Sequence, residues 1–288
     1  MIQIVFVKWG KAYGVAEVNG LLAAIRRHTR QSLRPVCITD DASGLDPSIE
    51  PMPFAELGIS FEQMTGPGCF AKLSVFAPGL LAGGLRTLYF DLDTSVHGDV
   101  ARLAACLDRR RALYMLPNHY VQTWRLRPLL HRIAPQAYYF ANSSVMAFYP
   151  EDYHFLAERF RRDYPAALAR ARATGEALHS AFRADDRYIS HAARRTLRVF
   201  PSSLAARFQD SYMTFGFRMS ALRDALPWVR RQRARRVALT YMGGATKPKQ
   251  LARIADGTEI VYGPLKTRWN YPELRDYWRA IAAPERNP

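Results

Sequence analysis

The N-terminal third of the chain alternates between two kinds of hydrophobic pattern. Three mainly apolar runs predict buried strands, at residues 2–7, 34–39 and 85–90. Two stretches between them, residues 16–28 and 68–76, repeat their apolar positions with the period of a helix. This order predicts an α/β fold with a mainly parallel central sheet and flanking helices, whose ligands lie at the carboxyl ends of the strands.

The remainder of the chain shows no internal repeat, low-complexity segment or clear linker. Apolar runs predict further strands at residues 112–116, 144–148, 196–200 and 237–242. Helices are expected to begin at Pro150, with acidic residues in the first turn, and at Asp185. We therefore expect a single domain over residues 1–256, with an aromatic and basic C-terminal extension over residues 257–288 that packs on it.

Two aspartates one residue apart follow the third predicted strand, in the run Leu88-Tyr89-Phe90-Asp91-Leu92-Asp93-Thr94. Because residues i and i+2 of a strand point to the same side, Asp91 and Asp93 are expected to aim two carboxylates at one point. Two such charges repel each other and lose hydration, and a bound divalent cation removes both costs. The pattern predicts a site for Mn²⁺ or Mg²⁺ that also holds a diphosphate. A helix N-cap followed by a solvated turn is the alternative interpretation.

Composition and charge indicate which classes of protein the chain can belong to. The 288 residues are about half hydrophobic, and no apolar run is long enough for a transmembrane helix. The first residues have the pattern of a strand and not of a signal peptide, and Cys37, Cys69 and Cys106 form no metal-type pair, so we expect a cytoplasmic protein with reduced thiols. The net charge of +16 comes largely from arginine, with clusters at 109–111 and 230–236. These arginines are not interleaved with aromatic residues as in nucleic-acid-binding modules, so no specific nucleic acid is expected.

Seven short motifs follow one another along residues 1–250: Phe6-Val7-Lys8-Trp9 with Tyr13, Val36-Cys37-Ile38-Thr39-Asp40-Asp41, Phe70-Ala71-Lys72-Leu73-Ser74-Val75-Phe76, the run around Asp91 and Asp93, Asn142-Ser143-Ser144-Val145-Met146, Ala184-Asp185-Asp186-Arg187, and Gly244-Ala245-Thr246-Lys247-Pro248. This ordered set resembles GT-A-type glycosyltransferases related to family 8. That group includes glycogenin and bacterial galactosyltransferases of surface glycans.

The resemblance implies a nucleotide-sugar-binding domain that transfers a hexose from a nucleoside-diphosphate sugar, with uridine as the expected base. Retention of anomeric configuration and a surface-glycan, lipopolysaccharide or other acceptor are implied with it. It assigns Asp91 and Asp93 to the metal, and it assigns these residues to the nucleotide and its phosphates: Val7, Lys8, Tyr13, Asp40, Lys72, Gly244 and Lys247. The donor sugar and the reacting centre are assigned Asn142, Asp185 and Asp186.

Two positions depart from the pattern of the family. Tyr241 stands where the late motif normally carries a histidine that acts as a third metal ligand, and a phenol is a poor ligand for these metals. Either another group completes the shell, with Gln209 and Asp210 nearby in the sequence, or the metal is bound weakly. Asp186 stands in place of a glutamine, which changes the surroundings of the reacting centre.

Two other functions fit parts of the sequence. Asp91 and Asp93 after an apolar strand also fit a haloacid-dehalogenase-like phosphatase, in which the first aspartate is the nucleophile and the second a general acid. That fold usually opens with its aspartate motif, and its later acidic pair is missing from this sequence. A degenerate, non-catalytic transferase fold that binds polyanions through its arginines is the second alternative, and Tyr241 is its main support.

The arginine clusters also predict where the protein acts. Together with the aromatic C-terminal segment, including Trp269 and Trp278, they are expected to form a peripheral face that binds an anionic membrane surface. Such a face suits an enzyme that modifies a lipid-linked acceptor at the inner membrane surface. A solvated basic helix on a soluble enzyme is the alternative. The sequence gives no indication of the oligomeric state.

Overall fold

The structure is a computed structural model that describes residues 1–117, 129, 132–133, 141–241 and 248–282. Its main sheet has the strand order β3-β2-β1-β4-β7-β6-β8. The strands are β3 (Glu50–Met52), β2 (Leu33–Thr39), β1 (Ile2–Lys8), β4 (Arg86–Phe90), β7 (Ala141–Phe148), β6 (Leu113–Pro117) and β8 (Leu197–Val199). Strand β7 runs antiparallel to both of its neighbours, and the other pairs are parallel. The predicted α/β architecture with a mainly parallel sheet is therefore confirmed.

Successive side chains along each strand point alternately into two hydrophobic cores, one on each face of the sheet. On β1, Ile4 and Phe6 join the core beneath the helices α1 (Val15–His28) and α3 (Ala101–Arg109). Val5 and Val7 point to the other face. That face is covered by the 3-10 helix η1 (Phe70–Phe76) and the helices α5 (His154–Thr174) and α6 (Asp185–Ala192).

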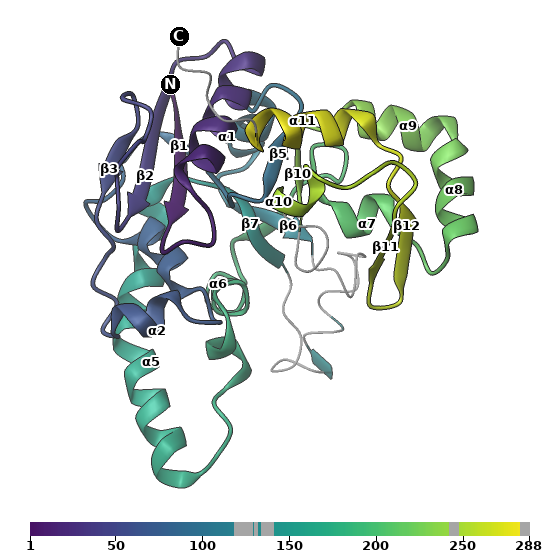
Figure 1. Cartoon of the computed structure of the whole chain (residues 1–288). Helices are drawn as coiled ribbons and strands as arrows, with labels where there is room; N and C mark the ends of the chain where they lie inside the picture. The colour runs from purple at the N-terminus through teal and green to yellow at the C-terminus, as the bar shows by residue number, and fades with distance from the viewer. Residues whose placement is uncertain (118–128, 130–131, 134–140, 242–247, 283–288) are drawn as a thin grey trace.

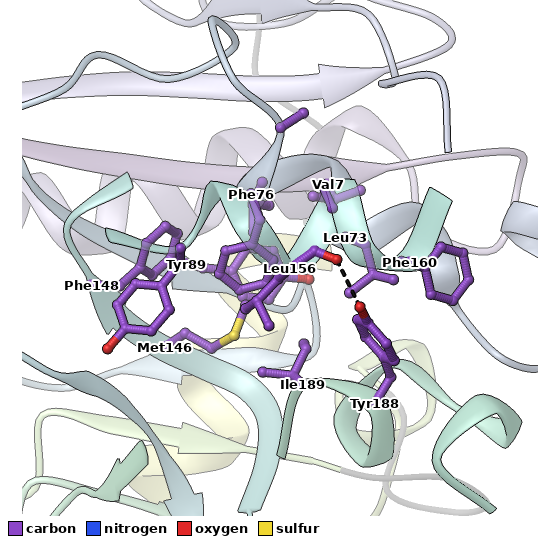
Figure 2. Packing of buried hydrophobic residues seen from close by; sticks show 14 of the residues in the cluster. Val7, Leu73, Phe76, Tyr89, Met146, Phe148, Leu156, Phe160, Tyr188 and Ile189 are labelled. Carbon is purple, nitrogen blue, oxygen red and sulfur yellow. Dashed lines mark hydrogen bonds between the residues drawn. The ribbon is translucent and has the colours of Figure 1, made fainter. Parts of the chain in front are cut away.

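Figure 2 shows the packing on this second face. Side chains from β4, β7, η1, α5 and α6 meet there, and the hydroxyl of Tyr188 donates to the backbone oxygen of Leu156 over 2.9 Å. This bond satisfies the polar end of an otherwise buried ring. It ties α6, which begins with Asp185 and Asp186, to the start of α5.

A second layer of smaller elements adjoins the main sheet, on the side drawn in green and yellow in Figure 1. It contains a three-stranded sheet of order β5-β10-β9 and the hairpin β11–β12. The strands are β5 (Thr94–Val96), β10 (Ala238–Thr240), β9 (Ala205–Arg207), β11 (Glu259–Tyr262) and β12 (Leu265–Arg268). The helices of this layer are α7 (Phe208–Tyr212), α8 (Phe217–Ala225), α9 (Pro227–Ala234), α10 (Pro248–Leu251) and α11 (Pro272–Ala282). The short elements α2 (Phe61–Thr65), η3 (Pro150–Asp152) and η4 (Ser180–Arg183) complete the described part of the fold.

The C-terminal helix α11 lies against α1 at Gly20. A Cβ atom at this glycine would stand only 2.7 Å from Cγ1 of Ile281, so the close approach of the two helices requires a residue without a side chain. Trp269 and Trp278 are 0 % and 1 % exposed and pack around Phe208 and Tyr241. The prediction that these tryptophans reach a membrane surface was therefore wrong, because they form the core of the second layer.

Three local predictions differ from the structure. The helix expected from Pro150 is a 3-10 turn followed by α5, which starts at His154 and ends at Thr174, where Gly175 adopts a left-handed φ of 70°. Residues 70–76 form a 3-10 helix and not an α-helix. Only part of the 230–236 cluster is a surface feature: Arg230, Arg231 and Arg235 are exposed, whereas Arg236 is 4 % exposed and Arg233 packs on Tyr212.

Candidate active site

Asp91 and Asp93 lie in the tight turn that connects β4 to β5. The turn is held by the backbone amide of Asp91, which donates to Ser144 on β7 over 2.8 Å, and by that of Thr94, which donates to the Asp91 carbonyl over 3.1 Å. Leu92 between them is buried. The two carboxylates therefore share one site because the chain turns, and not because they alternate along an extended strand as the sequence predicted.

A cavity of about 200 Å³ opens at this turn, at the carboxyl end of β1. It brings together six of the residues that the sequence singled out: Val7, Lys8, Tyr13, Lys72, Asp91 and Asp93. Trp9, Ala12, Cys69 and Leu92 complete its lining. These residues come from three separate segments of the chain, so the parallel arrangement of β1 and β4 creates the site.

Asp93 is held by two hydroxyl groups and is short of positive charge. The phenol of Tyr13 donates to Oδ2 of Asp93 over 3.4 Å, and the hydroxyl of Thr240 donates to Oδ1 over 3.3 Å. Burial, followed by repulsion from Asp91, raises the pKa of Asp93 from 3.8 to about 7. Burial and the same two aspartates raise the pKa of Tyr13, which keeps the phenol protonated. The site thus holds a carboxylate whose charge lacks a full counterpart.

Lys72 supplies a cation beside this pair. Its Nζ atom lies 2.8 Å from Oδ2 of Asp91 and 3.7 Å from Oδ2 of Asp185. Burial alone would lower its pKa, but Asp185 and Asp91 raise the pKa of Lys72 well above its usual value, so the amine stays charged. The hydroxyl of Tyr89 also donates to Asp91. Lys72 therefore links the turn after β4 to the start of α6.

Asp185 and Asp186 open α6 beside this lysine. Asp185 is 5 % exposed, its carboxylate accepts from the Ser143 hydroxyl, and its backbone amide donates to Gly68 over 2.9 Å. Burial raises the pKa of Asp185, and burial with repulsion from Asp185 raises the pKa of Asp186 to about 7. Among the described residues, the Lys72 ammonium thus lowers the cost of keeping charge on four aspartates: Asp91, Asp93, Asp185 and Asp186.

The remaining predicted residues lie at different distances from this centre. Asp40 accepts from the backbone amide of Gly10 over 3.1 Å, which places it by the loop that carries Tyr13. The ammonium of Lys8 donates to the carbonyl of Asp41 over 3.0 Å. Asn142 is buried in β7, where its Oδ1 accepts from the amide of Ser144, and it does not line the cavity. Gly244 and Lys247 lie outside the described residues.

Tyr241 is not in the site. Its ring is fully buried against Phe208 and Trp278, and its hydroxyl lies 3.2 Å from the Ser95 hydroxyl. Only its backbone amide approaches the turn, by donating to the Asp93 carbonyl over 2.9 Å. Asp210, considered above as a substitute ligand, is paired with Arg207. Tyr241 therefore acts as a core residue behind the site, and its phenol does not stand in for a metal ligand.

Sequence reasoning missed three polar groups of the site. Tyr89 lies two residues before Asp91 on β4, so the alternation of the strand could have indicated that it points to the same side. Ser143 belongs to a motif in which only Asn142 was singled out. Cys69 lines the cavity with a left-handed φ of 53°, and burial raises its thiol pKa to about 11, so the thiol is protonated and unreactive.

The donor set of this cavity fits a hard divalent cation. Asp91 and Asp93 offer carboxylate oxygens to one cavity, and burial with repulsion from Asp91 raises the pKa of Asp93, which a cation would reverse. In the described part of the chain, no cluster of three or more histidine, cysteine, aspartate and glutamate residues has the arrangement of a metal site.

Comparisons with known proteins identify the fold. No family model matches the sequence, and no curated protein sequence matches it. The structure resembles that of the galactosyltransferase LgtC, solved with donor and acceptor sugar analogues, with a TM-score of 0.57 and 15 % identity over 99 % of this chain and 98 % of LgtC.

Two further structures show the same likeness. The glycosyltransferase GlyE of Streptococcus pneumoniae TIGR4 has a TM-score of 0.52 and 14 % identity over 98 % of this chain and 63 % of GlyE. The bifunctional glycosyltransferase WbbM has a TM-score of 0.51 and 15 % identity over 86 % of this chain and 46 % of WbbM. The order of motifs, the mainly parallel sheet and these likenesses agree, and the chain has the GT-A-type fold of glycosyltransferases.

Proposed function

We propose that this protein is a metal-assisted glycosyltransferase that uses a nucleoside-diphosphate sugar as donor. The observation that carries the proposal is the cavity at the carboxyl ends of β1 and β4, where two aspartates with unbalanced charge meet an aromatic loop and a buried lysine. In folds of this class ligands bind at that edge of the sheet. LgtC, which shares the fold, was solved with donor and acceptor sugar analogues.

The two ends of a donor have separate places in this arrangement. The loop after β1, with Val7, Lys8 and Tyr13, would hold the nucleoside, and Asp40 lies at its edge. Uracil is the base we propose, because the motif around Tyr13 resembles that of uridine-diphosphate-dependent transferases. Asp91 and Asp93 would hold Mn²⁺ or Mg²⁺, which when bound neutralises the charge that develops on the leaving diphosphate.

Lys72 and the start of α6 would face the sugar and its phosphates. The Lys72 ammonium, already held between Asp91 and Asp185, adds positive charge where the leaving group forms. Asp185 and Asp186, at the start of α6, would accept hydrogen bonds from sugar hydroxyls, together with Asn142 on β7. The resemblance also assigns Gly244 and Lys247, which lie outside the described residues, to the phosphates. A hexose donor and retention of configuration belong to the same proposal.

The acceptor we propose is a surface glycan or a lipid-linked glycan, reached at an anionic membrane surface. Four large apolar side chains on and beside α8 and α9 are exposed, namely Phe215, Met219, Leu222 and Trp228. Arg218, Arg230 and Arg231 stand among them on the same two helices. Apolar groups beside arginines are the combination that binds anionic bilayers. No helix in the described part of the chain is long and apolar enough to cross a membrane.

The two alternatives have less support. The phosphatase interpretation places its nucleophile after the first strand of the domain, whereas Asp91 follows β4, and the structural likenesses are to glycosyltransferases. The degenerate transferase was supported mainly by Tyr241, whose side chain lies in the core and leaves the metal pair intact.

Turnover of nucleotide sugars tests the proposal. The protein is incubated with Mn²⁺ and a panel of uridine-diphosphate sugars, and release of uridine diphosphate is measured with and without glycan acceptors. We expect release that stops in excess chelator and in Asp91→Asn. The matched control is Asp108→Asn, which removes an exposed carboxylate on α3 and should keep full activity. Chelator-resistant turnover, or no release and no thermal stabilisation by any nucleoside diphosphate with Mn²⁺, would reject the proposal.

A further inference from the structure

A second, larger cavity lies in the layer formed by the C-terminal half of the chain. It has a volume of about 990 Å³ and lies between α8, α9, β12 and α11, which group together in the green and yellow part of Figure 1. This volume is in the range of small-molecule sites. Within the described residues it shares no lining residue with the cavity at Asp91 and Asp93. The strand β5 separates the two: Asp93 precedes it, and His97 follows it and lines the larger cavity.

The lining of this cavity is strongly basic. Among the described residues it contains five arginines, Arg218, Arg230, Arg233, Arg236 and Arg268. The carboxylates in the lining are Asp224 and Glu273. Burial lowers the pKa of His97 to about 4, so this imidazole is neutral near pH 7. The described walls of the cavity therefore carry three more positive than negative charges.

Two of these guanidinium groups are buried with hydrogen-bonding capacity to spare. Arg236 is 4 % exposed; its Nε and Nη2 donate to the carbonyl of Ser202, but its Nη1 has no partner in the described structure. The Arg233 side chain is 12 % exposed, and its Nε has no partner there either. Both atoms are inaccessible to solvent, so these two guanidinium groups contribute positive charge behind the cavity wall rather than free donors to a ligand.

The Asp224 carboxylate is the acceptor shared by several side chains around these two arginines. Asp224 accepts from Nη2 of Arg233 over 2.6 Å and from the Tyr271 hydroxyl over 2.7 Å, and Nε of Arg223 lies 3.6 Å away. The Tyr212 ring lies beneath the Arg233 guanidinium, 3.9 Å from its carbon atom, and holds it in place. Burial and the charge of Arg233 lower the pKa of Arg236. The cluster is thus fixed in position and short of negative charge.

We propose that this cavity binds a phosphate group. A phosphate carries multiple negative charge and several acceptor oxygens, which match the planar donor sets of arginine. Its oxygens would accept from the exposed guanidinium groups of Arg218 and Arg230 at the cavity wall, while the buried guanidinium groups of Arg233 and Arg236 would add positive charge behind them. The phosphate belongs either to a soluble phosphorylated compound or to a lipid headgroup, and this site is independent of the proposed sugar transfer.

Binding of inorganic pyrophosphate to the full chain tests the site, measured by calorimetry and by thermal shift. The experiment is done in excess chelator, so that Asp91 and Asp93 have no cation with which to hold a diphosphate. We expect binding that weakens as salt rises. Arg218→Gln with Arg230→Gln should weaken it by about tenfold or more, since each charge-assisted bond of ~1.5 kcal/mol corresponds to roughly that factor. Both arginines are exposed, so this variant should fold.

The matched control removes the same charge elsewhere. Arg170→Gln with Arg172→Gln changes two exposed arginines near the end of α5 and should bind pyrophosphate as the unmodified protein does. A second arm uses phosphatidylcholine vesicles with and without phosphatidic acid. Pyrophosphate binding without any preference for phosphatidic acid identifies a soluble ligand. Sedimentation only with phosphatidic acid, lost in the cavity variant and kept both in the α5 control and in Arg231→Gln with Arg235→Gln, which removes two exposed charges beside the cavity, identifies a lipid headgroup, and either result supports the phosphate site.

Two results would overturn it. One is the absence of binding to both pyrophosphate and phosphatidic-acid vesicles. The other is equal weakening in the cavity variant and in the α5 control, which would mean that only the net charge of the protein matters.

Discussion

Replacing Asp93 by asparagine should stabilise the protein while removing its capacity to hold a metal. The buried carboxylate of Asp93 faces that of Asp91, and together burial and this repulsion raise its pKa to about 7. Asparagine has nearly the same shape and carries no charge; its amide oxygen can accept from the Thr240 hydroxyl, and its NH₂ group can donate to the oxygen of the Tyr13 hydroxyl. The substitution therefore removes a charge that burial and the neighbouring Asp91 carboxylate disfavour, and leaves the packing unchanged.

The magnitude follows from the two pKa values and has a definite sign. The folded-state pKa lies above the ordinary value of 3.8, so the carboxyl group costs nothing below pH 3.8 and destabilises the fold increasingly as the pH rises towards 7. A shift of this size corresponds to roughly 4 kcal/mol above pH 7, which is an upper value because the cavity can relax. The gain in Asp93→Asn should be about 2–3 kcal/mol larger at pH 8 than at pH 5.

Urea unfolding in excess chelator measures this effect directly. The free energy of unfolding is compared for the unmodified protein and Asp93→Asn at pH 5 and pH 8. Asp108→Asn is the control, because its carboxylate is exposed and paired with Arg86, so its loss should cost about 0–1 kcal/mol at either pH. Addition of Mn²⁺ at pH 8 should then raise the melting temperature of the unmodified protein and not that of Asp93→Asn.

The reasoning is refuted if Asp93→Asn is no more stable than the unmodified protein at pH 8, or if its gain is the same at both pH values. Equal stabilisation of both proteins by Mn²⁺ would separately show that the cation binds elsewhere.

Three further predictions follow from other parts of the molecule. Tyr241→His should leave Mn²⁺ affinity unchanged and lower stability by about 2 kcal/mol or more, because the ring fills the core against Phe208; tighter metal binding by titration calorimetry would contradict the position of the phenol. Burial lowers the folded-state pKa of His97 from 6.5 to about 4, so the stability that the neutral imidazole contributes is lost as the pH falls from 6.5 to 4. His97→Gln should reduce the change in unfolding free energy over this pH range by roughly 2 kcal/mol, measured by urea unfolding. An unaltered pH dependence would show that the imidazole is not desolvated. Trp228→Ser with Arg231→Gln should reduce co-sedimentation with anionic vesicles, each arginine contributing about 1 kcal/mol, and recovery equal to that of the unmodified protein would remove α9 from the membrane face.

The fold class followed from the sequence because its signals are local. Mainly apolar runs mark strands buried on both faces, and helical spacing in residues 16–28 marks the helix that covers them, with Val18, Leu21, Leu22 and Ile25 buried as their spacing requires. The aspartate pair could also be located, since it ends such a run. These features depend on neighbours within a few residues, and the sequence displays them directly.

The site could be predicted only as a collection of residue types. That Lys72 stands between Asp91 and Asp185, and that Tyr13 and Thr240 both donate to Asp93, depends on five segments that meet only when β1, β4 and β10 are in place. The hydrogen bonds of the turn, and not strand alternation, set the directions of the two carboxylates. No local pattern encodes such distances.

The tertiary structure also decided which of the aromatic and basic side chains are buried. The sequence shows that Trp269, Trp278 and Tyr241 are aromatic, but it does not show that they lie together in a separate hydrophobic core. Likewise, five arginines in seven residues give a charge, whereas the helix and its neighbours determine that Arg233 and Arg236 turn inward and line a cavity. The sequence by itself determined which groups the chain carries and which segments form strands and helices; only long-range packing decided which of those groups lose water and face one another, because burial is a property of the assembled fold.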